Sequence, residues 1–133
     1  MPGSSAEENS PLVLVVDDDP TNLKLARDVL LAAGFRTVVA ESGNEAVALA
    51  AEHLPDVILM DLWLPDMDGA DAARILRDES RTAAIPVVLL SAIALEGDTA
   101  WLADVEFAGH LAKPIDIDAF PGEVRRFCRR NPG

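Results

Sequence analysis

The chain has 133 residues, a single cysteine, a formal net charge of −12, and a composition that is half hydrophobic. This length predicts one domain with one core, and the hydrophobic content excludes general disorder. The negative charge disfavours direct binding to nucleic acid or to an anionic membrane. One cysteine excludes an internal disulfide and a cysteine-rich zinc cluster. No apolar run reaches the about 18 residues of a membrane span, and residues 1–10 lack signal-peptide features, so we expect a cytoplasmic protein.

Short apolar runs recur along the chain and predict β-strands. The runs at 56–61 and 85–91 are apolar on both faces, which is typical of central strands in a parallel sheet covered on both sides. In chain order, the predicted strands are 11–17, 35–40, 56–61, 85–91 and 107–112.

Segments with helical spacing of apolar residues follow these strands. Gly34 is the expected end of the first helix, and Ser42 or Asn44 is the expected cap of the second. Pro121 would clash in the second turn of a longer last helix, so we expect that helix to begin at or near Pro121, after a separate short turn at 117–120. In chain order, the predicted helices lie around 23–33, 46–50, 70–77, 97–104 and 121–128.

This alternation predicts an α/β fold, a (βα)5 doubly wound five-stranded parallel sheet in the order 2-1-3-4-5. The topological switch point then lies between strands 1 and 3. We expect one domain over residues 11–130, with tails at 1–10 and 131–133.

Polar residues follow the predicted strands at the carboxyl edge of the sheet, where such folds bind ligands. Strand 1 ends at Asp17 and Asp18, strand 3 at Asp61 and strand 4 at Ser91, and strand 5 runs into Lys113. Carboxylates this close raise one another's pKa, and Mg²⁺ with oxygen ligands relieves the repulsion. A carboxylate beside a cation, a hydroxyl and a lysine suits phosphoryl transfer to that carboxylate. The alternative is that Asp17 and Asp18 cap the first helix.

Four motifs, "VLVVDDDP", "DVILMDLWLPDMDG", "IPVVLLSA" and "LAKPI", resemble the receiver domain of bacterial two-component response regulators. The resemblance spans nearly the whole chain beyond the first residues and implies a flavodoxin-like receiver fold. It implies that Asp61 is the phosphoacceptor. It also implies a Mg²⁺ site, with Mn²⁺ or Ca²⁺ as substitutes, formed by Asp18, by Asp17 through a water, by Asp61 and by the main-chain carbonyl of Trp63.

The same resemblance assigns roles to residues of the last two strands. Ser91 would hydrogen-bond the phosphoryl group and move on activation, and Lys113 would pair with a phosphoryl oxygen. His110 stands where the family usually has Tyr or Phe as a switch residue. It is either a switch that turns inward when Ser91 engages the phosphoryl group or a partly buried histidine with an ordinary hydrogen bond.

The expected partner surface includes Trp101, Glu106 and Pro114. Trp101 either packs against the sheet or is an exposed anchor, since tryptophan is enriched at interaction hot spots. Glu106 stands where the family often has a glycine, which changes the loop before strand 5.

Other polar residues have simpler interpretations. Asp66 and Asp68 are expected to be solvated loop acids, with Asp68 also a candidate helix cap. Asp19 looks peripheral, and Gly69 supplies backbone freedom where a helix starts. The arginines of the last helix are expected to complement its C-terminus: Arg125, Arg126, Arg129 and Arg130.

The resulting prediction is a stand-alone, single-domain response regulator. A sensor histidine kinase or histidine phosphotransfer protein would phosphorylate Asp61, and a downstream protein effector would read the result or the phosphate would be relayed. The protein would catalyse only its own phosphorylation and dephosphorylation, as a monomer or weak dimer. The alternatives are a receiver excised from a hybrid kinase, an unphosphorylated interaction module, a flavodoxin-like FMN binder, and a phosphohydrolase with Asp17 and Asp19 as its D-x-D motif.

Overall fold

Five parallel strands form one sheet in the order β2-β1-β3-β4-β5, as predicted. The structure is a computed structural model and describes residues 10–91, 107–113 and 115–128. Each strand lies within one of the predicted apolar runs. The strands are β1 (Leu12–Val16), β2 (Arg36–Ala40), β3 (Val57–Asp61), β4 (Val87–Ser91) and β5 (Gly109–Ala112).

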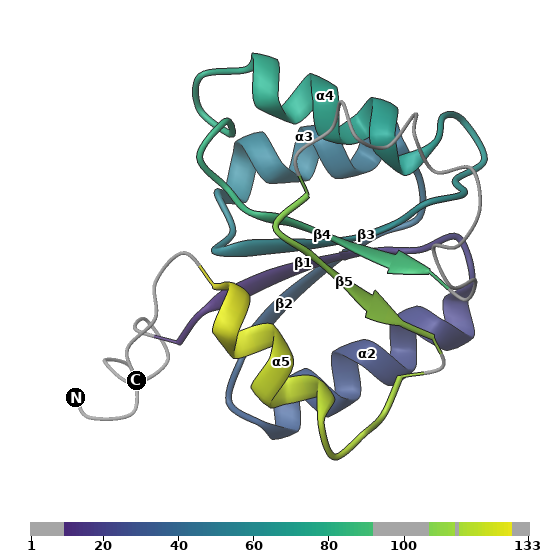
Figure 1. Cartoon of the computed structure of the whole chain (residues 1–133), viewed down its shortest axis with the longest axis vertical. Helices are drawn as coiled ribbons and strands as arrows, with labels where there is room; N and C mark the ends of the chain where they lie inside the picture. The colour runs from purple at the N-terminus through teal and green to yellow at the C-terminus, as the bar shows by residue number, and fades with distance from the viewer. Residues whose placement is uncertain (1–9, 92–106, 114, 129–133) are drawn as a thin grey trace.

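Helices cover both faces of the sheet, so the fold is doubly wound (Figure 1). Two of them, α2 (Pro20–Ala32) and α5 (Phe120–Phe127), lie on one face. The other two described helices, α3 (Gly43–His53) and α4 (Gly69–Asp78), lie on the opposite face. None of the described helices is long and apolar enough to cross a membrane. The helix predicted around 97–104 lies outside the described residues.

Strand β3 shows why the central runs are apolar on both faces. Ile58 and Met60 pack in the cluster beneath α3 and α4, whereas Val57 and Leu59 pack in the cluster beneath α2 and α5. All four side chains are inaccessible to solvent. Burial of each stabilises the fold by about 1.5–3 kcal/mol, before conformational entropy is counted. Asp61 is the fifth residue of the same buried strand, so the core fixes its position.

Most helix boundaries follow from local sequence. Gly34 follows α2 with a φ of +95°, a conformation that favours glycine. Ser42 caps α3, and Asp68 caps α4 by accepting the Asp71 N–H. The N-cap of α2 is Asp19, so the alternative in which Asp17 and Asp18 cap this helix is wrong.

The last helix begins one residue before the predicted proline. Its first residue is Phe120, and Pro121 lies in the first turn, where the missing N–H costs nothing. The Phe120 N–H donates to the Asp116 carbonyl, and residues 117–119 form the separate turn that was predicted.

Candidate functional site

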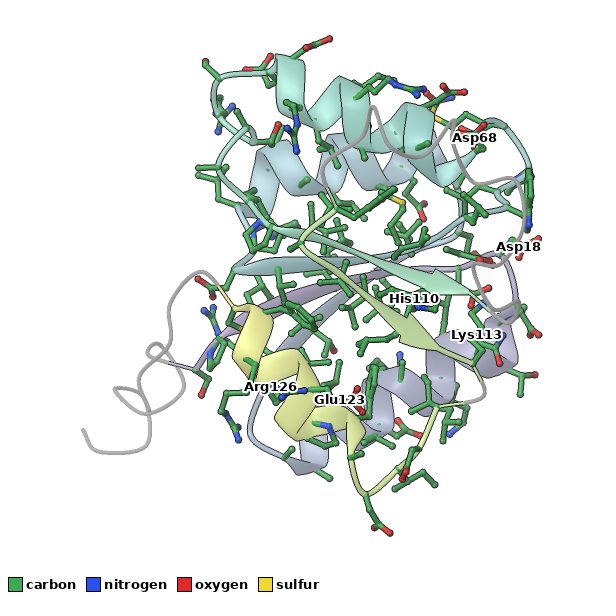
Figure 2. All side chains as sticks on the ribbon, viewed as in Figure 1. Asp18, Asp68, His110, Lys113, Glu123 and Arg126 are labelled. Carbon is green, nitrogen blue, oxygen red and sulfur yellow. The ribbon has the colours of Figure 1, made fainter. Side chains whose placement is uncertain are left out.

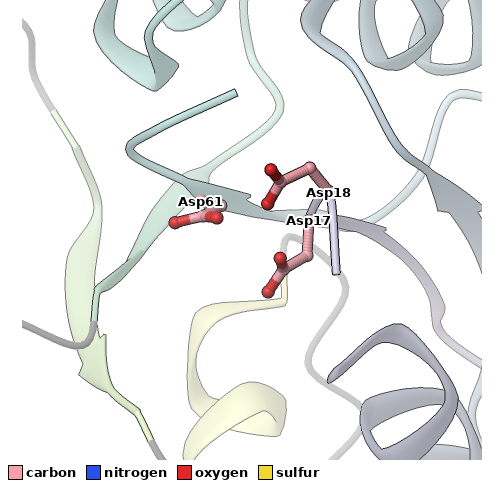
Figure 3. Close-up of side chains that lie close together, drawn as sticks. All are labelled: Asp17, Asp18 and Asp61. Carbon is pink, nitrogen blue, oxygen red and sulfur yellow. The ribbon is translucent and has the colours of Figure 1, made fainter. Parts of the chain in front are cut away.

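Three carboxylates meet at the carboxyl edge of the sheet. Asp17 and Asp18 directly follow β1, and Asp61 ends β3, the neighbouring strand. One oxygen from each of the three carboxylates lies within 4.8 Å of the others. The carboxylates of Asp17 and Asp18 are directed toward Asp61 (Figure 3). Asp17 and Asp61 are buried, whereas Asp18 is exposed, so the group opens to solvent on one side.

Lys113 brings a positive charge to these acids from the chain after β5. Its Nζ atom lies 2.6 Å from Asp17 Oδ2 and 3.4 Å from Asp61 Oδ2. The other oxygen of Asp17 accepts the Asp19 N–H at 2.9 Å. Lys113 and Asp18 lie at the same end of the sheet (Figure 2). The topology therefore brings together Lys113 and Asp17, which are 96 positions apart.

The electrostatics of the site favour a bound cation. Burial raises the pKa of Asp61, and the charge of Asp17 raises it further, against the opposing effects of Lys113 and the Trp63 N–H. Burial opposes the charged form of Lys113, but the hydrogen bond to Asp17 and the charges of Asp17 and Asp61 outweigh it and raise the pKa of Lys113. Three carboxylates with one ammonium leave net negative charge in a partly buried place. Hard oxygen ligands of this kind fit Mg²⁺.

Trp63 lies in the β3–α4 loop, which comprises residues 62–68. The residue is 58% exposed. Its N–H donates to the Asp61 carboxylate, and its main chain forms an isolated bridge with Asp68. This main chain therefore lies beside the site, and the assignment of its carbonyl as a cation ligand stays a prediction.

Ser91 lies on β4 and His110 lies on β5, the two strands that follow β3 in the sheet order. Ser91 is the last residue of β4, and Asp61 on β3 pairs with the residue before it, so the Ser91 main chain lies near the same edge. The Ser91 side chain lies outside what the structure describes. His110 is exposed on β5, so the interpretation of a partly buried histidine is wrong. Its role as a switch stays a prediction.

The predicted partner-surface residues, Trp101, Glu106 and Pro114, lie outside the described residues. Asp19 accepts the Thr21 N–H at 2.9 Å as the α2 cap and does not belong to the carboxylate group with Asp17. This placement counts against a phosphohydrolase D-x-D site.

Two side chains have contacts that the sequence did not predict. Asp66 is an exposed loop acid, as expected, and its carboxylate also accepts the N–H groups of Gly43 and Asn44 at the start of α3. Arg125 was expected to complement its own helix. It lies in the last turn of α5, as that expectation requires, and it also donates to the Ala33 carbonyl at the end of α2. No local signal reveals either contact, because each partner is distant in sequence.

A doubly wound five-stranded domain with acids after strands 1 and 3 and a lysine after strand 5 defines the receiver class of signalling domains. The family model for the response regulator receiver domain matches residues 13–125. The chain belongs to this family, which is the receiver module of two-component signalling.

Individual relatives fit this assignment. The chain is 36% identical over 115 residues to the polar-differentiation response regulator DivK of Brucella ovis, covering 86% of this chain and 94% of that protein. DivK of Brucella anthropi is 35% identical over 115 residues, which again cover 86% of this chain and 94% of that protein.

Two solved structures show the same fold. The chemotaxis protein CheY4 of Vibrio cholerae has a TM-score of 0.82 at 26% identity, with 89% of this chain and 98% of that chain covered. The receiver domain of a Pseudomonas aeruginosa sensor histidine kinase has a TM-score of 0.81 at 30% identity, with 89% of this chain and 97% of that chain covered. That receiver has a magnesium ion coordinated in its active site cleft.

Proposed function

We propose that this receiver accepts a phosphoryl group on Asp61 from the phosphohistidine of a sensor histidine kinase or a histidine phosphotransfer protein. The observation that supports this best is the position of the Asp61 carboxylate. It ends a buried strand, lies within 4.8 Å of two other carboxylates and is 3.4 Å from an ammonium group. Membership of the receiver family supports the same assignment.

The residues of the site would hold Mg²⁺ as follows. Asp18 and Asp61 would bind it directly, Asp17 would bind it through a water, and the Trp63 carbonyl would complete the protein ligands. When bound, the cation would neutralise the charge on the phosphoryl oxygens. The magnesium in the similar Pseudomonas receiver supports this assignment.

The chain's own residues account for the transfer. An Asp61 oxygen forms a bond to phosphorus while the bond from phosphorus to the histidine nitrogen breaks, and the electron pair of that bond leaves with the imidazole. Lys113 is close enough to pair with a phosphoryl oxygen on Asp61. Ser91 would donate a hydrogen bond to that group and would carry the signal to β5 and His110. The product is an acyl phosphate, whose added charge shifts the population of conformations that a partner reads.

The output would pass to a downstream protein effector, or the phosphate would be relayed to a phosphotransfer protein. The net charge of −12 disfavours nucleic acid as the direct partner. In this role the protein would catalyse only its own phosphorylation and dephosphorylation.

The test is intact-mass measurement after incubation with acetyl phosphate and Mg²⁺. Wild type is expected to gain one phosphoryl group, and Asp61→Asn is expected to gain none. Omission of Mg²⁺ is expected to suppress the gain on wild type. An unmodified wild type under these conditions would rule out the proposed function.

A further inference from the structure

Asp66 attaches the β3–α4 loop to a different helix. Its Oδ1 accepts the Gly43 N–H and its Oδ2 accepts the Asn44 N–H, each at 2.8 Å, from 23 and 22 residues away. A carboxylate at a helix N-terminus is favoured by the helix dipole and by its unpaired N–H groups. The hydrogen bond from Asn44, which has the largest effect, and the one from Gly43 hold the pKa of Asp66 below its usual range. Asp66 is therefore ionised at neutral pH and binds both N–H groups.

The local sequence of α3 leaves these two N–H groups open. Ser42, the N-cap, accepts the Glu45 N–H through its side chain and the Ala46 N–H through its carbonyl. The first two N–H groups of the helix need acceptors from elsewhere. Asp66 supplies both, so the cap of α3 is complete only when the β3–α4 loop is in place.

A second contact holds the loop at the same point. A Cβ atom at Gly43 would lie 2.6 Å from the sulfur of Met67, the residue after Asp66. Such a distance is too short for any other residue without displacing Met67. Met67 also packs against the buried cluster beneath α3 and α4. Asp66 and Met67, at the tip of the loop, therefore contact the start of α3 through polar and apolar contacts, respectively.

The base of the loop is closed by main-chain contacts. The Gly69 N–H donates to the Leu62 carbonyl at 2.6 Å, and Trp63 is bridged to Asp68. Trp63 thus lies in a short loop that is held at two points. Asp66 and Met67 contact the start of α3 at the tip, and the Trp63 N–H donates to the Asp61 carboxylate at the base. Freedom at the tip would be transmitted to the Trp63 main chain, because few residues separate them.

We propose that Asp66 is a positioning residue of the cation site. By attaching the loop to α3, it fixes the main chain of Trp63 at the orientation from which the Trp63 carbonyl binds Mg²⁺. Residues that orient metal ligands without touching the metal typically matter 10- to 100-fold in affinity. This inference rests on the proposed function, and it adds a residue that lies outside the ligand set.

The experiment compares three variants with wild type by NMR, in a titration with MgCl₂ and in amide hydrogen exchange. Asp66→Ala is expected to weaken Mg²⁺ binding roughly 10-fold or more and to speed exchange at Gly43 and Asn44. Ser42→Ala is the matched control. It removes a cap from the same helix but leaves the loop attached, so its Mg²⁺ affinity is expected to stay close to wild type.

Asp66→Asn separates positioning from charge. It removes the negative charge but keeps one acceptor oxygen for one N–H group, so an intermediate Mg²⁺ affinity is expected. Equal weakening by Asp66→Asn and Asp66→Ala would show that charge alone is responsible and would overturn the inference. Equal weakening by Asp66→Ala and Ser42→Ala would also overturn it, because helix fraying would then be the cause. Failure of wild type to bind Mg²⁺ would instead overturn the proposed function, and the role of Asp66 with it.

Discussion

The Lys113 ammonium lies closer to Asp17 than to Asp61, at 2.6 Å against 3.4 Å. Asp17 is only 2% exposed, so its charge needs a partner inside the protein. Lys113 provides that partner and leaves Asp61 less well compensated, which agrees with the raised pKa of Asp61. The lysine therefore stabilises the site in addition to its proposed role toward the phosphoryl group.

Lys113→Met is expected to lower the free energy of unfolding by about 1–3 kcal/mol in EDTA, because it leaves a buried carboxylate without its charged partner. MgCl₂ is expected to recover part of this loss, because a cation that binds the folded state replaces the missing charge. Urea denaturation in EDTA and in MgCl₂ measures both effects. Lys24→Met is the control, since Lys24 pairs with Asp28 on the exposed surface of α2, where solvent screens the pair, and it should change stability much less. Equal losses for the two variants would contradict the prediction.

Asp61→Asn is expected to stabilise the metal-free protein at neutral pH. A folded-state pKa above the unfolded value of 3.8 means that the folded state binds the proton more tightly. Wild type therefore loses stability as the pH rises from 3.8 through the folded pKa, and the variant does not. The stability gap should close as the pH falls below 3.8. Thermal unfolding in EDTA across this range measures it.

Asp28→Asn is expected to change stability at neutral pH in the opposite direction. The hydrogen bond from Lys24 lowers the pKa of Asp28, so its ionised form contributes stability above 3.8 that is lost as the pH falls through the folded pKa. This variant should be slightly less stable than wild type at neutral pH and equal to it in acid. If Asp61→Asn were also less stable than wild type at neutral pH, the interpretation of Asp61 would be wrong.

Local patterns were sufficient to predict the strands, their order, and the edge at which Asp17, Asp18 and Asp61 meet. Strand periodicity depends on a few neighbouring residues, and the handedness rule depends on the order of whole elements. Both can therefore be read from a single sequence. The contacts of Asp66 and Arg125 were missed because each side chain reaches a backbone group on another element. The exposure of His110 was also missed, because it depends on what covers an edge strand rather than on the strand itself.

The role of Gly69 was predicted for the wrong reason. It was expected to supply backbone freedom, but Gly34 is the glycine with positive φ among the described residues. A Cβ atom at Gly69 would instead overlap the main-chain oxygen of Asp61. The glycine is therefore needed for the close approach of α4 to the end of β3, which only the folded structure reveals.

Asp18→Asn and Trp63→Ala should separate a side-chain ligand from a main-chain ligand. Asp18→Asn replaces a charged oxygen ligand with a neutral one and is expected to weaken Mg²⁺ binding roughly 10-fold or more. Trp63→Ala removes an exposed indole but keeps the carbonyl, so Mg²⁺ affinity is expected to stay close to wild type. Isothermal titration calorimetry with MgCl₂ measures both. A large loss in Trp63→Ala would show that the indole, rather than the carbonyl, supports the site.

Gly69→Ala is expected to lower both stability and phosphorylation. The new methyl group must displace the Asp61 main chain or α4, at a cost of about 1–3 kcal/mol. Because Asp61 is the proposed phosphoacceptor, the rate of acetyl phosphate labelling should fall as well. Gly122→Ala is the matched control, since Gly122 lies on the exposed side of α5 and a Cβ atom there meets nothing within 4 Å.

The control should stabilise the protein by about 0.5–1 kcal/mol, because alanine favours the helix, and should leave labelling unchanged. Urea denaturation gives the stabilities, and intact mass against time gives the labelling rates. Normal labelling in a destabilised Gly69→Ala protein would show that the close approach serves α4 packing alone. Reduced labelling at temperatures where the variant is fully folded would show that it also sets the position of Asp61.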